Sequence, residues 1–98
     1  MPTFVCLFNW TDQGIKNVRD TTKRSERFTA AIKKAGGSVK GIYWTLGRYD
    51  GLIVFEAPDE ASATAIMLSG GTLGSVRTET LRAFDAAEMD KILAKMRA

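Results

Sequence analysis

Two short segments of this chain are apolar on both faces of the strands that they predict. Residues 3–10 read TFVCLFNW and residues 52–55 read LIVF. Both are rich in β-branched and aromatic residues and are bounded by turn-forming residues, which is typical of strands. A strand that is apolar on both faces is normally covered on both faces. We therefore expect both faces of the sheet that contains these strands to be packed against other parts of the structure.

A helical region follows the first strand. Apolar residues recur at helical spacing over residues 15–35. Residues 20–22 are poor helix formers and good caps, which predicts a short first turn, a break and a main helix over residues 22–35. Gly36 and Gly37 then end that helix.

The second half of the chain repeats this alternation. Residues 39–46 and 49–57 predict an antiparallel hairpin around Gly47 and Arg48. A helix over residues 61–69 begins after the capping residue Asp59, and residues 76–84 predict a fourth strand. Residues 85–88 read DAAE, a capping-box pattern that starts a last helix with an apolar stripe.

The element order is therefore βαββαβ with an extra C-terminal helix. It predicts a single α+β domain over residues 1–98: a ferredoxin-like, four-stranded antiparallel sheet with two helices on one face. Two helices leave the other apolar face of the sheet open to water. Soluble monomers rarely expose a patch of that kind, so we expect a homodimer, or a higher even oligomer, that packs sheet against sheet.

Composition excludes several classes of site. The chain has no histidine and one cysteine, Cys6, which lies in an apolar run and is expected to be a small buried residue. No metal-ligand cluster is present, so neither a metal nor a cofactor is expected. The N-terminus lacks the features of a signal peptide and no apolar run is long enough to span a bilayer, which predicts a cytoplasmic protein without a membrane partner.

Nucleic acids and nucleotides are not predicted as ligands either. The net charge is +3, and the basic residues of the first third fit a solvated helix face. The third strand lacks the basic-glycine-aromatic signature of RNA-recognition domains. The glycine-rich residues 70–74 follow the end of a helix, whereas a phosphate loop precedes a helix N-terminus.

The run over residues 43–51 is the first candidate site, because aromatic and charged residues surround a glycine break there. Asp50 is either a turn residue that accepts backbone hydrogen bonds or a catalytic carboxylate that pairs with Arg48 or with Arg77 from a neighbouring strand. Tyr43, Trp44 and Tyr49 either fill core or interface, or form an aromatic wall for a flat ligand. Tyr43 and Trp44 are adjacent in a strand, so only one of them can line a given pocket.

Two further polar residues complete the predicted ligand-binding set. Asn9 ends the first strand on an otherwise apolar face, where it either caps the strand or provides a polar group inside an apolar cavity. Arg77 shares a face of the fourth strand with Glu79. It either joins an exposed ladder of ion pairs or anchors an anionic ligand or Asp50.

Three segments give the chain a resemblance to a known family. They read TDQGI at residues 11–15, YWTLGRYD at residues 43–50 and LGSVRTETLRAF at residues 73–84. With Gly47, Tyr49 and Asp50 as its naming residues, the chain resembles the GYD domain family of the dimeric α/β barrel superfamily. The resemblance implies a βαββαβ protomer and a dimer whose sheets face each other. Many enzymes of that superfamily use a histidine, so histidine-ligated haem chemistry is not supported here.

Two functional hypotheses follow. The first is a small dimeric barrel protein that binds a small organic ligand or serves as an oligomeric scaffold. The alternative is a cofactor-independent enzyme, of the monooxygenase or isomerase type, acting on an aromatic or polyketide-like substrate. In that enzyme Tyr43, Trp44 or Tyr49 would stack the substrate, Asn9 and Arg77 would hold its oxygens, and Asp50 would assist proton transfer. The alternative rests on analogy with the superfamily, which is weak evidence for function.

Overall fold

The computed structural model describes residues 1–97 and contains the predicted four-stranded antiparallel sheet. The strands are β1 (Thr3–Trp10), β2 (Ser38–Trp44), β3 (Gly51–Glu56) and β4 (Val76–Ala83). Their order in the sheet is β2-β3-β1-β4, with every neighbouring pair antiparallel. The two central strands, β1 and β3, are the two whose apolar character is strongest. The ferredoxin-like order predicted from the sequence is therefore confirmed.

The helices alternate with these strands as predicted. They are α1 (Asp12–Lys16), the short 3-10 helix η1 (Val18–Asp20), α2 (Thr21–Lys34), α3 (Glu60–Gly71) and α4 (Ala86–Leu93). The break after the first turn is confirmed, as is the end of α2 before Gly36, which has a φ of 88°. The predicted caps are also confirmed: Asp59 accepts from the Ser62 amide, and Asp85 forms a capping box with Glu88.

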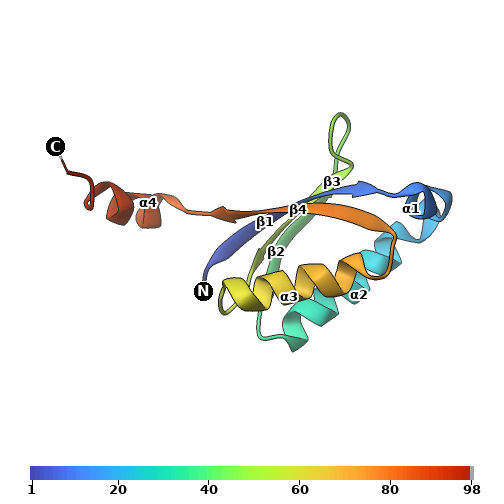
Figure 1. The fold of residues 1–98 in the computed structure, drawn as a ribbon, viewed down its shortest axis with the longest axis horizontal. Coiled ribbons are helices and arrows are strands. Elements are labelled where there is room, and N and C mark those ends of the chain that lie inside the picture. Colours follow the sequence, from blue (N-terminus) through green and yellow to red (C-terminus); the bar gives the residue numbers. More distant parts are fainter. Residues whose placement is uncertain (98) are drawn as a thin grey trace.

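Helices α2 and α3 lie side by side on one face of the sheet (Figure 1). The strand residues that point toward them are buried: Phe4, Cys6, Phe8, Ile53 and Phe55. They pack with apolar residues of the two helices to form the core, and the rings of Phe4 and Phe55 stack with centroids 5.5 Å apart. This alternation explains why every second residue of β1 and β3 is buried.

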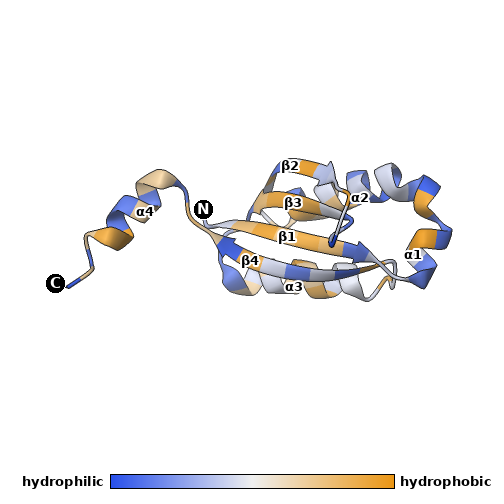
Figure 2. Cartoon of the chain, turned by 90° about the horizontal axis from the view of Figure 1, so that it is seen from above, coloured by the Kyte–Doolittle hydropathy of each residue, from blue (hydrophilic) through white to orange (hydrophobic). Residues whose placement is uncertain are grey.

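The other face of the sheet carries no helix, and Figure 2 looks onto it. Val5 and Leu7 of β1 lie opposite Val54 and Leu52 of β3 in register, and Leu81 of β4 lies beside Val5. These four residues of β1 and β3 are only half-buried. We call the surface formed by Val5, Leu7, Leu52, Val54 and Leu81 the open face. Its existence confirms that the two helices cover one side of the sheet only.

The hairpin between β2 and β3 differs from the prediction. The connection spans residues 45–50 and includes Leu46 and Tyr49, which were expected to lie in strands. Thr45 explains the longer loop, because its amide donates to the Asp50 carbonyl at 2.9 Å and its hydroxyl donates to the Tyr49 carbonyl at 2.6 Å. Gly47 takes a φ of 105° within the loop.

Each edge of the sheet has a distinct feature. On β2 the register shifts between Val39 and Gly41, so that Lys40 forms a bulge and its Nζ lies 3.2 Å from Glu56 Oε1. On the opposite edge, β4 alternates exposed threonines with charged residues.

The C-terminal helix α4 projects away from the sheet as a continuation of β4 (Figure 1), and we call this helix the arm. Its apolar residues Met89, Ile92 and Leu93 are exposed, as is Phe84 before it. Arg82 fixes the base of this arm: its guanidinium donates to the Thr3 carbonyl at 3.0 Å and lies 3.2 Å from Glu88 Oε2. Within residues 1–97, no helix has the length and apolar character needed to cross a membrane.

Candidate functional site

Asp50 and Asn9, two of the predicted site residues, meet at the end of β1. Asp50 Oδ2 accepts a hydrogen bond from the Trp10 amide at 2.9 Å. The Asp50 amide in turn donates to the Phe8 carbonyl at 2.9 Å and to Asn9 Oδ1 at 3.1 Å. These contacts join the hairpin loop to a strand forty residues earlier in the chain. The arrangement is a hydrogen-bonded latch between the loop and β1.

Tyr49, Arg48 and Glu79 form a second group beside this latch. The Tyr49 hydroxyl donates to Glu79 Oε2 at 2.7 Å, and the Arg48 guanidinium lies 5.7 Å from the centre of the Tyr49 ring. The hydrogen bond to the Glu79 carboxylate raises the pKa of Tyr49 above its ordinary value. Glu79 is paired with Leu7 in register, so this group borders the open face.

Arg48 and Arg77, the two arginines predicted to pair with Asp50, form no ion pair with it in the described chain. In residues 1–97 the ion pairs are Lys40–Glu56 and Arg82–Glu88. Arg77 lies opposite Asn9 in register and is exposed. The structure thus places Arg77 beside Asn9, at the same end of the sheet as the latch.

Tyr43 and Trp44 face opposite sides of the sheet, as predicted from their adjacency. Tyr43 lies opposite Leu52, on the open face, and is largely exposed. The Trp44 ring turns toward the helices, where its Nε1 donates to Thr21 Oγ1 at 3.0 Å. Trp44 is therefore the member of the pair that lies on the side of the helices.

A cavity of about 800 Å³ lies on that side, between α2, α3 and the sheet. Its aromatic residues are Phe8, Trp10, Phe28 and Trp44, and Ile53 lies among the residues of the sheet that line it. We call this space the inner cavity. Its volume falls in the range of about 300–1,000 Å³ that is typical of small-molecule sites. Of the predicted site residues, Trp44 lines it.

The inner cavity was not predicted from the sequence, although a signal for it exists. The surfaces of α2 and α3 that line the cavity carry small residues, among them Ala31, Ala35, Ala65 and Ser69. Small residues at helical spacing are compatible with close packing of a helix on the sheet. They also leave space between two helices when a larger residue holds the helices apart. Phe28 of α2, whose ring lies against Gly70 of α3, is such a residue.

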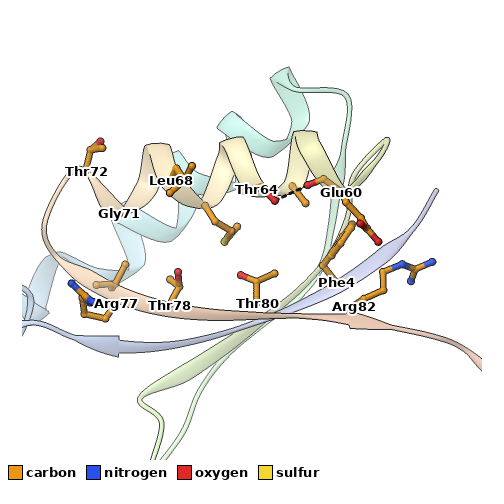
Figure 3. Close-up of a pocket in the computed structure, with 13 residues that line it drawn as sticks. Phe4, Glu60, Thr64, Leu68, Gly71, Thr72, Arg77, Thr78, Thr80 and Arg82 are labelled. Carbon is orange, nitrogen blue, oxygen red and sulfur yellow. Dashed lines mark hydrogen bonds between the residues drawn. The ribbon is translucent and has the colours of Figure 1, made fainter.

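A second hollow, of about 700 Å³, lies between α3 and β4 near the base of the arm. Figure 3 shows Thr78 and Thr80 of β4 below Thr64 and Leu68 of α3, with Arg82 at one end. Apart from Val76, the β4 residues that line this hollow are polar, unlike the buried residues of β1 and β3. This hollow carries both Glu60 and Arg82, so it has no single sign of charge.

Cys6 is buried in the core, as predicted, and lines the inner cavity from the sheet. Burial raises the pKa of the Cys6 thiol to about 11, and a hydrogen bond with Thr80 lowers it in part. The thiol is therefore protonated at neutral pH and is a poor nucleophile. Within residues 1–97, no three histidine, cysteine or acidic side chains are grouped to hold a metal ion.

Comparison with known proteins agrees with this architecture. The sequence model of the GYD domain matches residues 4–93. The chain belongs to the GYD domain family. The resemblance seen in residues 11–15, 43–50 and 73–84 is thus confirmed over most of the chain.

A curated relative and a solved structure, both from Thermus thermophilus, extend the comparison. The relative, named glutamine synthetase and cystathionine beta-lyase binding protein, is 34% identical over 90 residues, which cover 91% of this chain and 95% of the relative. The crystal structure of TTHA0845 has a TM-score of 0.56 at 26% identity and covers 88% of this chain and 96% of its own. The likeness therefore extends over most of this chain and over nearly all of each chain that it matches.

Proposed function

We propose that this GYD-domain protein is a homodimeric binding protein whose partners are other proteins. The observation that carries the proposal is the relative named for binding two enzymes, because it is 34% identical to this chain and aligned over 95% of its own length. By this likeness, the partners to test first are a glutamine synthetase and a cystathionine β-lyase. The cytoplasmic location expected from the sequence belongs to the same proposal.

The open face supports the homodimer. Val5, Leu7, Leu52 and Val54 form a contiguous apolar surface on the two central strands, and no helix of the described chain lies over it. A two-fold axis through this surface would bury it against itself, which is the usual geometry of a homodimer. The polar groups around Tyr49, Arg48 and Arg77 would then lie at the rim of that interface.

The arm supports a protein partner. An isolated helix of eight residues is marginal in water, and most helical stability in proteins comes from burying an apolar face. Helix α4 has a complete capping box, yet Met89, Ile92 and Leu93 remain exposed. An amphipathic helix that docks in an apolar groove is a recurring mode of protein recognition. We assign this role to α4.

Biolayer interferometry with the host's own glutamine synthetase and cystathionine β-lyase tests the proposal. Saturable binding to either enzyme by the full chain, and its loss when the chain ends at Phe84, supports it. Replacing the exposed Lys95, which lies outside the apolar stripe, by serine is the matched control and should bind like the wild type. No binding to either enzyme by a correctly folded dimer would overturn the proposal of protein partners.

A second candidate function, the binding of a small organic ligand, is favoured by the inner cavity. Its volume of about 800 Å³ lies within the range that is typical of small-molecule sites. Asp50 was predicted as the catalytic base of an enzyme acting on such a ligand. Because its Oδ2 accepts the Trp10 amide, we assign to Asp50 the role of holding the loop against β1, and to Asn9 that of a second contact in the same latch.

A further inference from the structure

We propose that the inner cavity binds an amphipathic anion: an apolar aromatic or aliphatic body with a single carboxylate or similar head group. This inference deepens the second candidate function and rests on it. It is independent of the protein partners proposed above. The helices that enclose the cavity, the sheet beneath it and the charges at its rim each support one part of this ligand's chemistry.

Two matched stripes, one on each helix, form the walls. On α2 the lining residues recur at helical spacing and are Thr21, Arg24, Ser25, Arg27, Phe28, Ala31 and Lys34. On α3 they recur in the same way and are Ser62, Ala65, Ile66, Met67, Ser69 and Gly70. Residues at this spacing lie on one face of a helix. The two stripes therefore face one another across the sheet, and their small residues leave the space between them open.

The floor of the cavity is apolar and aromatic. Phe8, Trp10, Ile42, Trp44 and Ile53 line it from the sheet. The two indole rings supply flat faces, and Trp44 is held in place by its hydrogen bond to Thr21. A cavity with this lining suits an apolar body.

The charges of the lining are all of one sign. Its charged residues in the described chain are Arg24, Arg27 and Lys34, all on α2, and no carboxylate lines the space. Arg24 donates to the Asn17 carbonyl at 2.6 Å, which holds it at the α1 end of the cavity. Arg27 and Lys34 are exposed at the rim, where a head group can remain partly solvated. Cations around an apolar space favour an anionic head on an apolar body, since charge-assisted hydrogen bonds are the stronger ones.

Displacement of a fluorescent probe tests the proposal. The probe is 8-anilinonaphthalene-1-sulfonate, followed by its own emission and by quenching of Trp10 and Trp44, the only two tryptophans of the chain. Dodecanoate and dodecanol, which share a tail and differ in charge, are the competitors. We expect dodecanoate to displace the probe at a concentration about tenfold lower than dodecanol, because hydrogen bonds to a charged group are the larger contribution.

Two pairs of variants locate the binding. Ala31→Phe fills the space between the helices and should weaken probe binding at least tenfold, whereas Ala30→Phe, outside the lining, should leave it unchanged. Ser69→Phe fills the same space from the opposite wall. Lys34→Glu should abolish the preference for dodecanoate, and its neighbour Lys33→Glu, also outside the lining, should preserve it. Circular dichroism checks that each variant is folded.

Each remaining outcome overturns a defined part of the inference. Equal displacement by dodecanoate and dodecanol, with Ala31→Phe still impaired, leaves a ligand site but contradicts the anionic class. Absence of tryptophan quenching, or equal binding by Ala31→Phe and Ala30→Phe, contradicts the ligand site itself. Probe binding that strengthens when the chain ends at Phe84 would show that α4 of a second copy occupies the cavity.

Discussion

The two faces of strands β1 and β3 are built from alternate residues of the same segments, yet they have different surroundings. Phe4, Phe8 and Phe55 point to the helices and are buried, while Val5 and Val54 between them are half-buried. Both sets are apolar. Only the inner set receives its cover from the chain itself. The alternating pattern thus shows that a face requires a cover, but it does not show which molecule supplies that cover.

The largest contrast between the faces is expected from truncating adjacent residues of β3. Phe55 is 0% exposed and stacks on Phe4, so Phe55→Ala should lower the free energy of unfolding by about 3–5 kcal/mol. Val54→Ala, on the open face, should cost less than about 1.5 kcal/mol in dilute solution. Urea denaturation measures both. Equal losses would mean that the open face is as well packed in one protomer as the core.

A charge on the open face should separate assembly from folding. If two protomers pack through this face, Val54→Asp buries a carboxylate on each side and should raise the dissociation constant of the dimer by about 100-fold or more. Val54→Thr has a similar shape without the charge and should have a much smaller effect. Sedimentation velocity gives the mass of each variant. An unchanged dimer in folded Val54→Asp would move the interface away from this face.

A methyl group added at Gly51, on the face of the sheet that the helices cover, should be tolerated poorly because Phe8 lies next to it. A Cβ on Gly51 would lie 2.2 Å from Phe8 Cζ, so Gly51→Ala should cost about 1–3 kcal/mol. Gly71, the last residue of α3, has open space around its Cα, and Gly71→Ala should be neutral or slightly stabilising. Thermal unfolding of the two variants measures the difference. A Gly51→Ala variant as stable as the wild type would show that both the Phe8 ring and the Tyr43 carbonyl, 2.7 Å from the added Cβ, can move.

The smallest expected effect lies at the rim of the open face and depends on pH. The Glu79 carboxylate raises the pKa of Tyr49 above its ordinary value, because it accepts a hydrogen bond from the protonated phenol. The stabilisation from this pair is complete below the unfolded pKa of about 10 and is lost as pH rises through the higher folded pKa. It is small, since the pair is exposed and screened by solvent.

Tyrosinate absorbance measures this shift directly. The chain has two tyrosines, so Tyr43→Phe leaves the absorbance of Tyr49 alone. Its titration midpoint should lie above that of an unperturbed tyrosine and should fall when Glu79→Gln is added. The same midpoint with and without the Glu79 carboxylate would contradict the role of the hydrogen bond.

Local sequence signals predicted the elements of this fold well. The capping box at Asp85, the end of α2 before Gly36 and the two-faced strands all depend on neighbouring residues, and each was predicted. The loop of the hairpin was predicted too short, because its ends are held by the Thr45 hydrogen bonds and its last residue, Asp50, is also held by the Trp10 amide. This last contact joins residues far apart in the sequence, so no local pattern reveals it.

The candidate sites were harder to predict than the elements. The adjacency of Tyr43 and Trp44 correctly predicted opposite faces, because strand geometry alone decides that. The inner cavity was not predicted, since its existence depends on how far α2 stands from α3. The same small residues, such as Ala31 and Ala65, are compatible with close packing or with an open space. The direction of α4 likewise follows from tertiary contacts of Arg82 with Thr3 and Glu88.

The features of the two edge strands also limit the forms that assembly can take. An unpaired strand edge is a template for adding further strands, and such addition does not end by itself. The bulge with a lysine at its centre on β2, and the charged residues Arg77, Glu79 and Arg82 on β4, are obstacles of the kind that natural sheets use against it. The chain thereby disfavours open-ended fibres and favours contacts through its faces, which close after a fixed number of subunits.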